Sequence, residues 1–116
     1  MRFGHIEVLA RDVKRSVEFY KAILGFEVTV EQGPDFVWLQ KGDLEILIRP
    51  GVAGETVGKY EHARTGFVLY TEDVLKMKAE LEERGLEFKG TVDSEKCFTF
   101  TDPDGNWFQL VNPEDH

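Results

Sequence analysis

The sequence of 116 residues is poor in cysteine and has no long apolar run. Its single cysteine, Cys97, excludes an intrachain disulfide and the multi-cysteine sets that hold zinc or iron–sulfur clusters. No stretch approaches the roughly 20 apolar residues of a membrane-spanning helix, and the N-terminus lacks the apolar core of a secretory signal peptide. The length suits one domain. We therefore expect a single-domain protein of the reducing cytoplasm, with no membrane partner.

Basic residues are also scarce. Lys and Arg together number 14 against 22 Asp and Glu, which leaves a net charge of −8. No run of Lys or Arg interrupts this acidity, so the chain lacks the basic face that contacts with nucleic acid phosphates require. We expect no nucleic-acid partner. An acidic surface favours neutral or cationic small ligands, although it also serves solubility alone.

The first half of the sequence predicts a β-α-β-β-β unit. Asp12 is typical of a helix N-cap, and Gly25 of the left-handed residue that ends a helix. Short runs around this helix alternate between apolar and polar residues, as in a strand with one buried face. The expected strands are residues 3–9, 26–30, 36–40 and 44–48, and the expected helix stripe is Val13, Val17, Tyr20 and Leu24.

The same order of elements recurs in the second half. Asp73 is the next N-cap and Gly85 the next helix end, so the chain contains an internal duplication. We expect module one over residues 1–49, a mobile connector over 50–64, and module two over 65–116. The expected strands of module two are residues 66–70, 87–92, 97–101 and 107–111.

Several motifs stand in a fixed order along the chain. They are His5-Ile6-Glu7-Val8, then Asp12-Val13 with Ser16 and Phe19-Tyr20, then Leu24-Gly25-Phe26, and finally the turn Asp102-Pro103-Asp104-Gly105-Asn106. Together they resemble the vicinal oxygen chelate superfamily over essentially the whole chain. That superfamily includes glyoxalase I, bleomycin-resistance proteins, fosfomycin-resistance enzymes, methylmalonyl-CoA epimerase and extradiol dioxygenases. The fold hosts many chemistries, so the activity has to come from the site residues.

The resemblance implies an α+β fold of two tandem βαβββ modules. Each module contributes four strands to a curved mixed sheet, with the helices outside and a ligand cup inside. Chains of this length in the family usually form homodimers, so a second copy of the chain is an expected partner.

Strand alternation predicts which side chains face the cup. The helix needs an apolar sheet face beneath it, so Ile6 and Val8 lie under the helix, and His5 and Glu7 face the cup. The same argument applies to the other strands. The further cup-facing residues are Phe36, Trp38, Gln40, Glu45, Leu47, Arg49, Gly66, Val68, Tyr70, Trp107, Gln109 and Val111.

Members of the family that bind a metal take one ligand from each of four strands. By position these ligands would be His5, Glu45, Gly66 and Gln109. Gly66 has no side chain and Gln109 offers only a neutral amide oxygen, so the set is incomplete. We therefore expect no cofactor, with a divalent metal held by His5 and Glu45 as the alternative. His62 in the connector is a further candidate ligand.

Glu45 and His5 are the expected catalytic residues if the protein is an enzyme. Glu45 would act as the base that removes a proton next to a carbonyl. An inward carboxylate between apolar neighbours needs a partner, which we expect to be His5 or Arg49. Such an ion pair would also serve structure alone.

The expected ligand contacts are large rings with polar groups around them. Several rings in an open cup suit a flat ligand, although rings on a sheet face also serve packing. Cys97 alternates with its aromatic neighbours and is expected to be a small buried apolar side chain. The ligand-binding candidates are Phe36, Trp38, Tyr70, Trp107, Glu7, Arg49 and Gln109.

Three functional hypotheses follow. The first is a protein similar to glyoxalase and bleomycin-resistance proteins that binds a small organic molecule, cationic or aromatic, without the family's complete metal site. The alternative is a lyase, isomerase or dioxygenase, dependent on metal or free of it, that uses Glu45 and His5. The third is an interaction module whose cup no longer binds a ligand.

Overall fold

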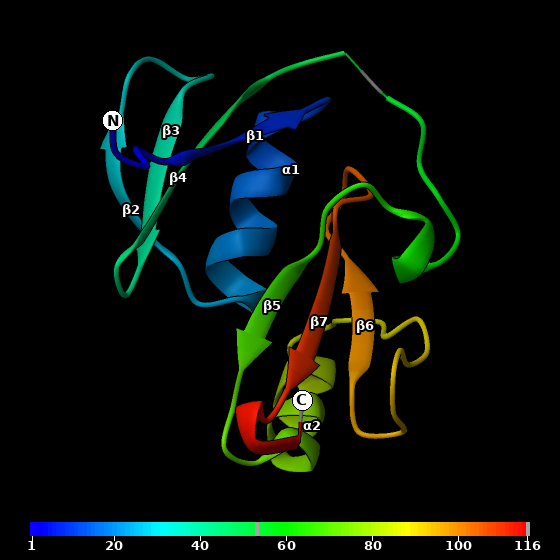
Figure 1. The fold of residues 1–116 in the computed structure, drawn as a ribbon. Helices are drawn as coiled ribbons and strands as arrows, with labels where there is room; N and C mark the ends of the chain where they lie inside the picture. Colours follow the sequence, from blue (N-terminus) through cyan, green and yellow to red (C-terminus); the bar gives the residue numbers. More distant parts are fainter. Residues whose placement is uncertain (53, 116) are drawn as a thin grey trace. The chain divides into compact units, whose positions relative to one another are not determined.

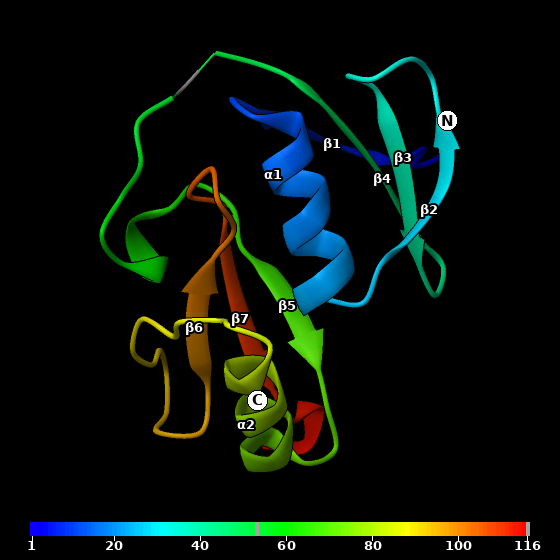
Figure 2. The same ribbon diagram turned by 180° about the vertical axis from the view of Figure 1, so that it is seen from behind.

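The computed structural model describes residues 1–52 and 54–115, and the chain divides into two compact units, residues 1–54 and 55–116 (Figure 1). Each unit combines one mixed β-sheet with one α-helix that packs on it (Figure 2). This confirms the α+β class and the duplicated arrangement. Within the described residues, no helix is long and apolar enough to span a membrane.

Unit one contains a four-stranded sheet in the order β1-β4-β3-β2. β1 runs parallel to β4, and the other pairs are antiparallel. The elements are β1 (Ile6–Ala10), α1 (Val13–Glu18), the π-helical turn η1 (Phe19–Ile23), β2 (Glu27–Glu31), β3 (Val37–Lys41) and β4 (Leu44–Pro50).

The first helix begins and ends where the sequence predicts, but its interior differs. The Asp12 carboxylate accepts a hydrogen bond from the Arg15 amide at 3.2 Å, and Gly25 has a φ of 75°. Between these caps, the α-helix widens into a π-helical turn from Phe19 onward. Val13, Tyr20 and Leu24 of the expected stripe are buried, but Val17 is only half-buried and Ser16 beside it is fully buried.

Unit two contains a three-stranded sheet in the order β5-β7-β6, with β5 parallel to β7. The elements are the 3-10 turn η2 (Tyr60–His62), β5 (Phe67–Tyr70), α2 (Val74–Glu83), β6 (Phe98–Thr101), β7 (Trp107–Val111) and the 3-10 turn η3 (Pro113–Asp115). As in α1, an aspartate caps α2, because Asp73 accepts a hydrogen bond from the Lys76 amide.

The strand expected over residues 87–92 is wrong, so unit two has three strands in place of four. The Lys89 amide donates to the Thr99 carbonyl at 2.7 Å, and the Thr99 amide donates to the Gly90 carbonyl at 2.9 Å. Gly90 has a φ of 98°, which takes the backbone out of the extended conformation. Only an isolated bridge between Thr91 and Phe98 follows.

The alternation of strand faces holds on β1 and β3 but fails on β4 and β7. On β4, Leu47 was expected to face the cup but is buried, and Leu44 was expected under the helix but is exposed. On β1 and β3, Val8 and Leu39 are buried, and Glu7 on the other face is exposed. All five residues of β7 are buried. A strand with both faces buried must be covered on both, and α2 packs against only one face of β7. The second face of β7 is covered by residues 55–62, which belong to the segment expected to be a mobile connector.

Candidate functional site

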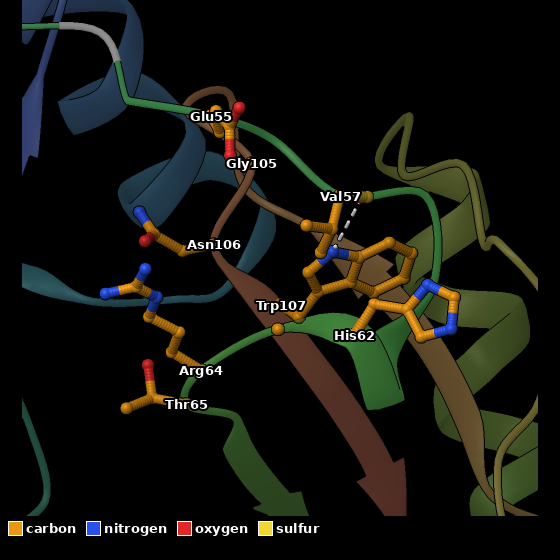
Figure 3. Close-up of a pocket in the computed structure, with 9 residues that line it drawn as sticks. Glu55, Val57, His62, Arg64, Thr65, Gly105, Asn106 and Trp107 are labelled. Carbon is orange, nitrogen blue, oxygen red and sulfur yellow. Dashed lines mark hydrogen bonds between the residues drawn. The ribbon is translucent and has the colours of Figure 1, made fainter.

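Residues 55–62 lie over the face of β7 that the sequence predicts to be open. The indole N–H of Trp107 donates to the Val57 carbonyl at 3.0 Å (Figure 3). The Gln109 amide donates to the Tyr60 hydroxyl at 2.8 Å, and its oxygen accepts from the Cys97 thiol at 2.7 Å. Trp107 and Gln109, both expected to line an open cup, are therefore buried inside unit two.

Tyr60 fills the space that a side chain at position 66 would need. A Cβ built on Gly66 would collide with the phenol oxygen of Tyr60. The same oxygen accepts the hydrogen bond from Gln109. In the family resemblance, Gly66 and Gln109 stand at two of the four metal-ligand positions. In this chain one phenol occupies the space between them.

The residues of unit two therefore do not fit the family's divalent metal. Gly66 offers no ligand atom, and the two polar ends of Gln109 are used by Tyr60 and Cys97. A divalent cation held by hard ligands prefers carboxylate or imidazole to a neutral amide that is already bonded. Within the described residues, no group of three or more His, Cys, Asp and Glu side chains is placed to hold a metal.

Cys97 is buried, as the sequence predicts. It is 1% exposed and packs with Val92 and Val111, with Tyr60 against this cluster. Burial raises the pKa of its thiol, so the reactive thiolate is disfavoured. Cys97 is thus a packing residue and a hydrogen-bond donor to Gln109.

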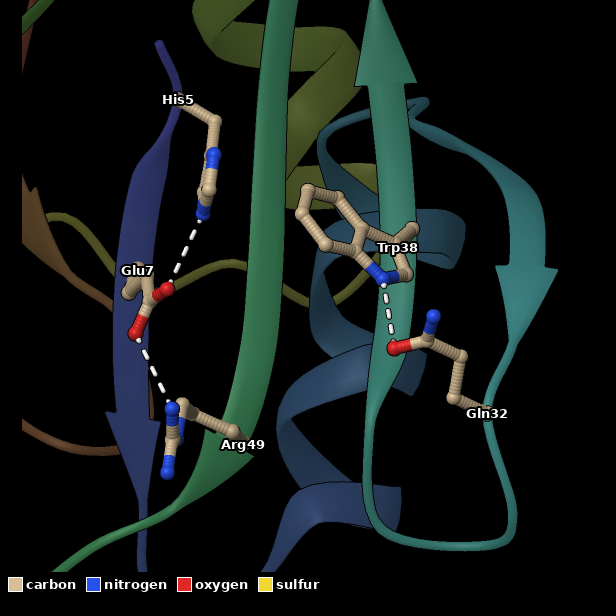
Figure 4. Close-up of polar contacts among 5 residues, drawn as sticks. All are labelled: His5, Glu7, Gln32, Trp38 and Arg49. Carbon is tan, nitrogen blue, oxygen red and sulfur yellow. Dashed lines mark hydrogen bonds and ion pairs between the residues drawn. The ribbon is translucent and has the colours of Figure 1, made fainter.

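In unit one, three charged or titratable side chains meet on the face of the sheet opposite α1 (Figure 4). The imidazole Nε2 of His5 and one carboxylate oxygen of Glu7 are 3.0 Å apart, and Nη1 of Arg49 is 3.3 Å from the other oxygen. All three side chains are partly exposed, at 29% for His5, 41% for Glu7 and 39% for Arg49. Glu7 is thus the shared acceptor of both neighbours.

The two neighbours favour the ionised form of Glu7. The hydrogen bond with His5 is the main cause that lowers the pKa of the Glu7 carboxyl, and the positive charge of Arg49 adds to it against a partial loss of hydration. Glu7 therefore carries a negative charge at neutral pH, as an unperturbed glutamate also does. This face therefore presents a carboxylate held between an imidazole and a guanidinium cation.

Aromatic rings border this charged group. The Trp38 ring meets the His5 ring edge-on with 4.6 Å between centroids, and its indole N–H donates to the Gln32 side chain at 3.1 Å. The Arg49 guanidinium lies 4.9 Å from the centre of the Phe36 ring. These contacts hold both rings in defined orientations beside Glu7.

The expected partners of Glu45 are engaged elsewhere. Glu45 is exposed on β4, and both His5 and Arg49 pair with Glu7. Among residues 1–52 and 54–115, no basic side chain forms an ion pair with Glu45. The prediction that His5 or Arg49 pairs with Glu45 is therefore wrong, and the Glu45 carboxylate, in the second residue of β4, is exposed to solvent.

The structure thus brings together His5, Glu7, Trp38, Phe36 and Arg49 in unit one. Tyr70, the remaining candidate, is 66% exposed on β5 of unit two. Sequence reasoning missed Tyr60, because no local pattern relates a connector tyrosine to a glycine six positions later. The only available signal was the missing side chain at Gly66, which leaves room for a neighbour.

The fold and these positions define a protein of the glyoxalase type. The model of the Glyoxalase/Bleomycin resistance protein/Dioxygenase superfamily matches residues 2–110, and the chain belongs to that family. It is 30% identical to YraH, an uncharacterised protein of Bacillus subtilis (strain 168), over 95% of this chain and 97% of YraH.

Two solved structures share the fold. One is TnmS3, an antibiotic binding protein from Streptomyces sp. CB03234, with a TM-score of 0.69, 24% identity, and coverage of 97% of this chain and 98% of TnmS3. The other is the fosfomycin resistance protein FosX from Listeria monocytogenes in complex with Mn(II), with a TM-score of 0.73, 20% identity, and coverage of 95% and 88%.

Replacement of Tyr60 by Phe tests the contact that fills unit two. The Gln109 amide would stay buried but lose its acceptor, so we expect the free energy of unfolding to fall by about 1–3 kcal/mol. Tyr70→Phe is the matched control, since its side chain is exposed and no change beyond about 0.5 kcal/mol is expected. Urea denaturation measures both variants. Equal stability of the two would contradict the role of the Tyr60 hydroxyl.

Proposed function

We propose that this protein binds a small organic molecule without the family's metal, on the face of unit one that carries His5, Glu7, Trp38 and Arg49. The single observation behind the proposal is the position of Tyr60. Its hydroxyl fills the space beside Gly66 and engages Gln109, so half of the family's ligand set is replaced by a packed phenol. In this proposal, aromatic rings, charged groups and apolar surface bind the ligand, without a metal.

The exposed side chains on this face favour a flat ligand that is neutral or cationic. Trp38 and Phe36 supply ring surface, and the exposed apolar residues Leu9 and Val30 share their face of the sheet. Arg49 offsets the charge of Glu7, but the exposed carboxylate of Glu45 adds a negative charge on β4. A cation beside an aromatic ring and a carboxylate gains from both contacts.

The relatives support binding as a use of this fold. TnmS3 is an antibiotic binding protein, and FosX is a fosfomycin resistance protein. At identities of 24% and 20%, each likeness shows the fold alone. The proposal extends to a homodimer in the cytoplasm, and light scattering of the purified chain should then give twice its mass of 13.3 kDa.

Indole resonances separate the two halves of the chain in a binding test. We expect 1-methylquinolinium, a flat cation, to shift the Trp38 indole N–H signal and to leave the Trp107 signal in place, because Trp107 is buried in unit two. Trp38→Leu should weaken binding about tenfold, which corresponds to loss of about 1.4 kcal/mol of stacking. Tyr70→Leu is the control for an exposed ring outside the proposed face.

Two results would contradict this proposal. One is unchanged affinity in Trp38→Leu. The other is stronger binding of the matched anion naphthalene-2-sulfonate than of the cation.

Thermal melts with Zn(II), Mn(II), Ni(II), Co(II) and Fe(II) test the second part of the proposal. A metal at 100 times its dissociation constant stabilises a protein by about 2.7 kcal/mol, which a melt detects easily. We expect no such rise for any of the five ions. A rise that disappears in His5→Ala would contradict metal-independent binding and direct attention to glyoxalase, epimerase and dioxygenase assays.

An enzyme that uses Glu45 and His5 is the second candidate. The observation in its favour is the free carboxylate of Glu45, which no basic side chain of the described residues neutralises. A solvent-exposed carboxylate is available to take a proton from a bound substrate. Under this hypothesis, Glu45→Gln abolishes turnover and leaves ligand binding unchanged. Full activity of Glu45→Gln would remove Glu45 as the base.

A further inference from the structure

Unit two contains a pocket of about 600 Å³ that the proposed function does not use (Figure 3). Residues 55–65, which precede β5, line one part of it, and the turn before β7 and the start of β7 line the other. Its polar side chains are Glu55, His62, Arg64, Thr65 and Asn106, and its apolar side chains include Val57 and Trp107.

Arg64 is the side chain that indicates what the pocket binds. Among the described residues, no acidic side chain pairs with its guanidinium, although the whole chain has 22 acidic residues against 14 basic ones. Glu55 lines the same pocket, but Figure 3 shows its carboxylate beside Gly105, away from Arg64. A guanidinium presents five N–H donors in a planar fork that matches a carboxylate.

The wall beside Arg64 is already ordered. The Asp102 carboxylate, 3% exposed, accepts hydrogen bonds from the Asn106 backbone at 2.9 Å and from the Asn106 side chain at 2.8 Å. Gly105 has a φ of 86° and packs closely against Thr56. A wall held in this way loses little conformational entropy when a ligand arrives.

The remaining lining groups fit an organic molecule with one charged end. Thr65 offers a hydroxyl next to Arg64, and His62 offers a ring nitrogen on another side of the pocket (Figure 3). Val57, Ala63 and the edge of Trp107 supply apolar surface. Donors near one wall and apolar atoms near another are the features that orient small ligands in pockets.

We propose that this pocket binds a small organic anion, with its carboxylate on Arg64 and Thr65 and its apolar body against Val57 and Trp107. The site lies wholly within unit two, and its charge preference is opposite to that proposed for unit one. Either proposal therefore stands or fails without the other.

Three ring compounds of one shape and different charge test the site. Benzoate, benzamide and benzamidine are titrated into the ¹⁵N-labelled full chain, with the Trp107 indole N–H as the reporter because it donates to Val57 at the pocket wall. We expect benzoate to shift this signal and to bind at least about tenfold more tightly than the other two. The Trp38 signal reports separately on unit one.

Two variants assign the affinity to Arg64. Arg64→Gln keeps hydrogen-bond donors and removes the charge, and we expect it to weaken benzoate binding about tenfold or more, as for a charge-assisted hydrogen bond. Lys96→Gln makes the same charge change at an exposed turn of unit two and should leave the affinity within about twofold. The spread of amide signals in each variant confirms folding.

Each of three results would overturn the proposal. They are benzamidine binding as tightly as benzoate, benzoate affinity equal in Arg64→Gln and the unaltered chain, and no Trp107 shift with benzoate up to its solubility. If the third result came with a benzoate response at Trp38, the anion would bind on unit one.

Discussion

The hydrogen bond from Gln109 to Tyr60 is the contact on which the site of unit two depends. It exists because position 66 is glycine, since any side chain there would take the space of the Tyr60 phenol. With Tyr60 in place, residues 55–62 cover the second face of β7, and all five residues of that strand are buried. β7, which the sequence predicts to line an open cup, is the buried core strand of unit two.

Unit one has a different constraint, which is the sharing of one carboxylate. Glu7 accepts from His5 and from Arg49, so neither is left to neutralise Glu45. The network is partly exposed and contributes little to stability by itself. Its effect is to orient His5 against Trp38, and Arg49 over Phe36, so that charge and rings form one surface.

The two units show how one repeated pattern leads to two different surfaces. Both begin with a strand followed by an aspartate-capped helix, and in both the first strand runs parallel to the last. In unit one the face opposite the helix carries the partly exposed side chains of His5, Glu7 and Arg49, and in unit two a connecting segment covers the corresponding face of β7. The difference arises mainly from the side chain of Tyr60 and from the absence of a side chain at Gly66. The segment that covers this face also lines a separate pocket around Arg64.

The sequence alone determined the α+β class, the duplication, the two capped helices and the buried faces of β1 and β3, because these follow from local periodicity and caps. It also predicted that Gly66 offers no metal ligand and that Gln109 offers only a neutral amide oxygen. Tertiary structure decided that the segment at 87–92 is not a strand, that Glu7 takes the partners expected for Glu45, and that Tyr60 closes unit two. Tyr60 and Gln109 are 49 positions apart, and Arg49 and Glu7 are 42 apart. Contacts over such separations depend on side-chain length and on which backbone lies opposite, and no local period encodes either.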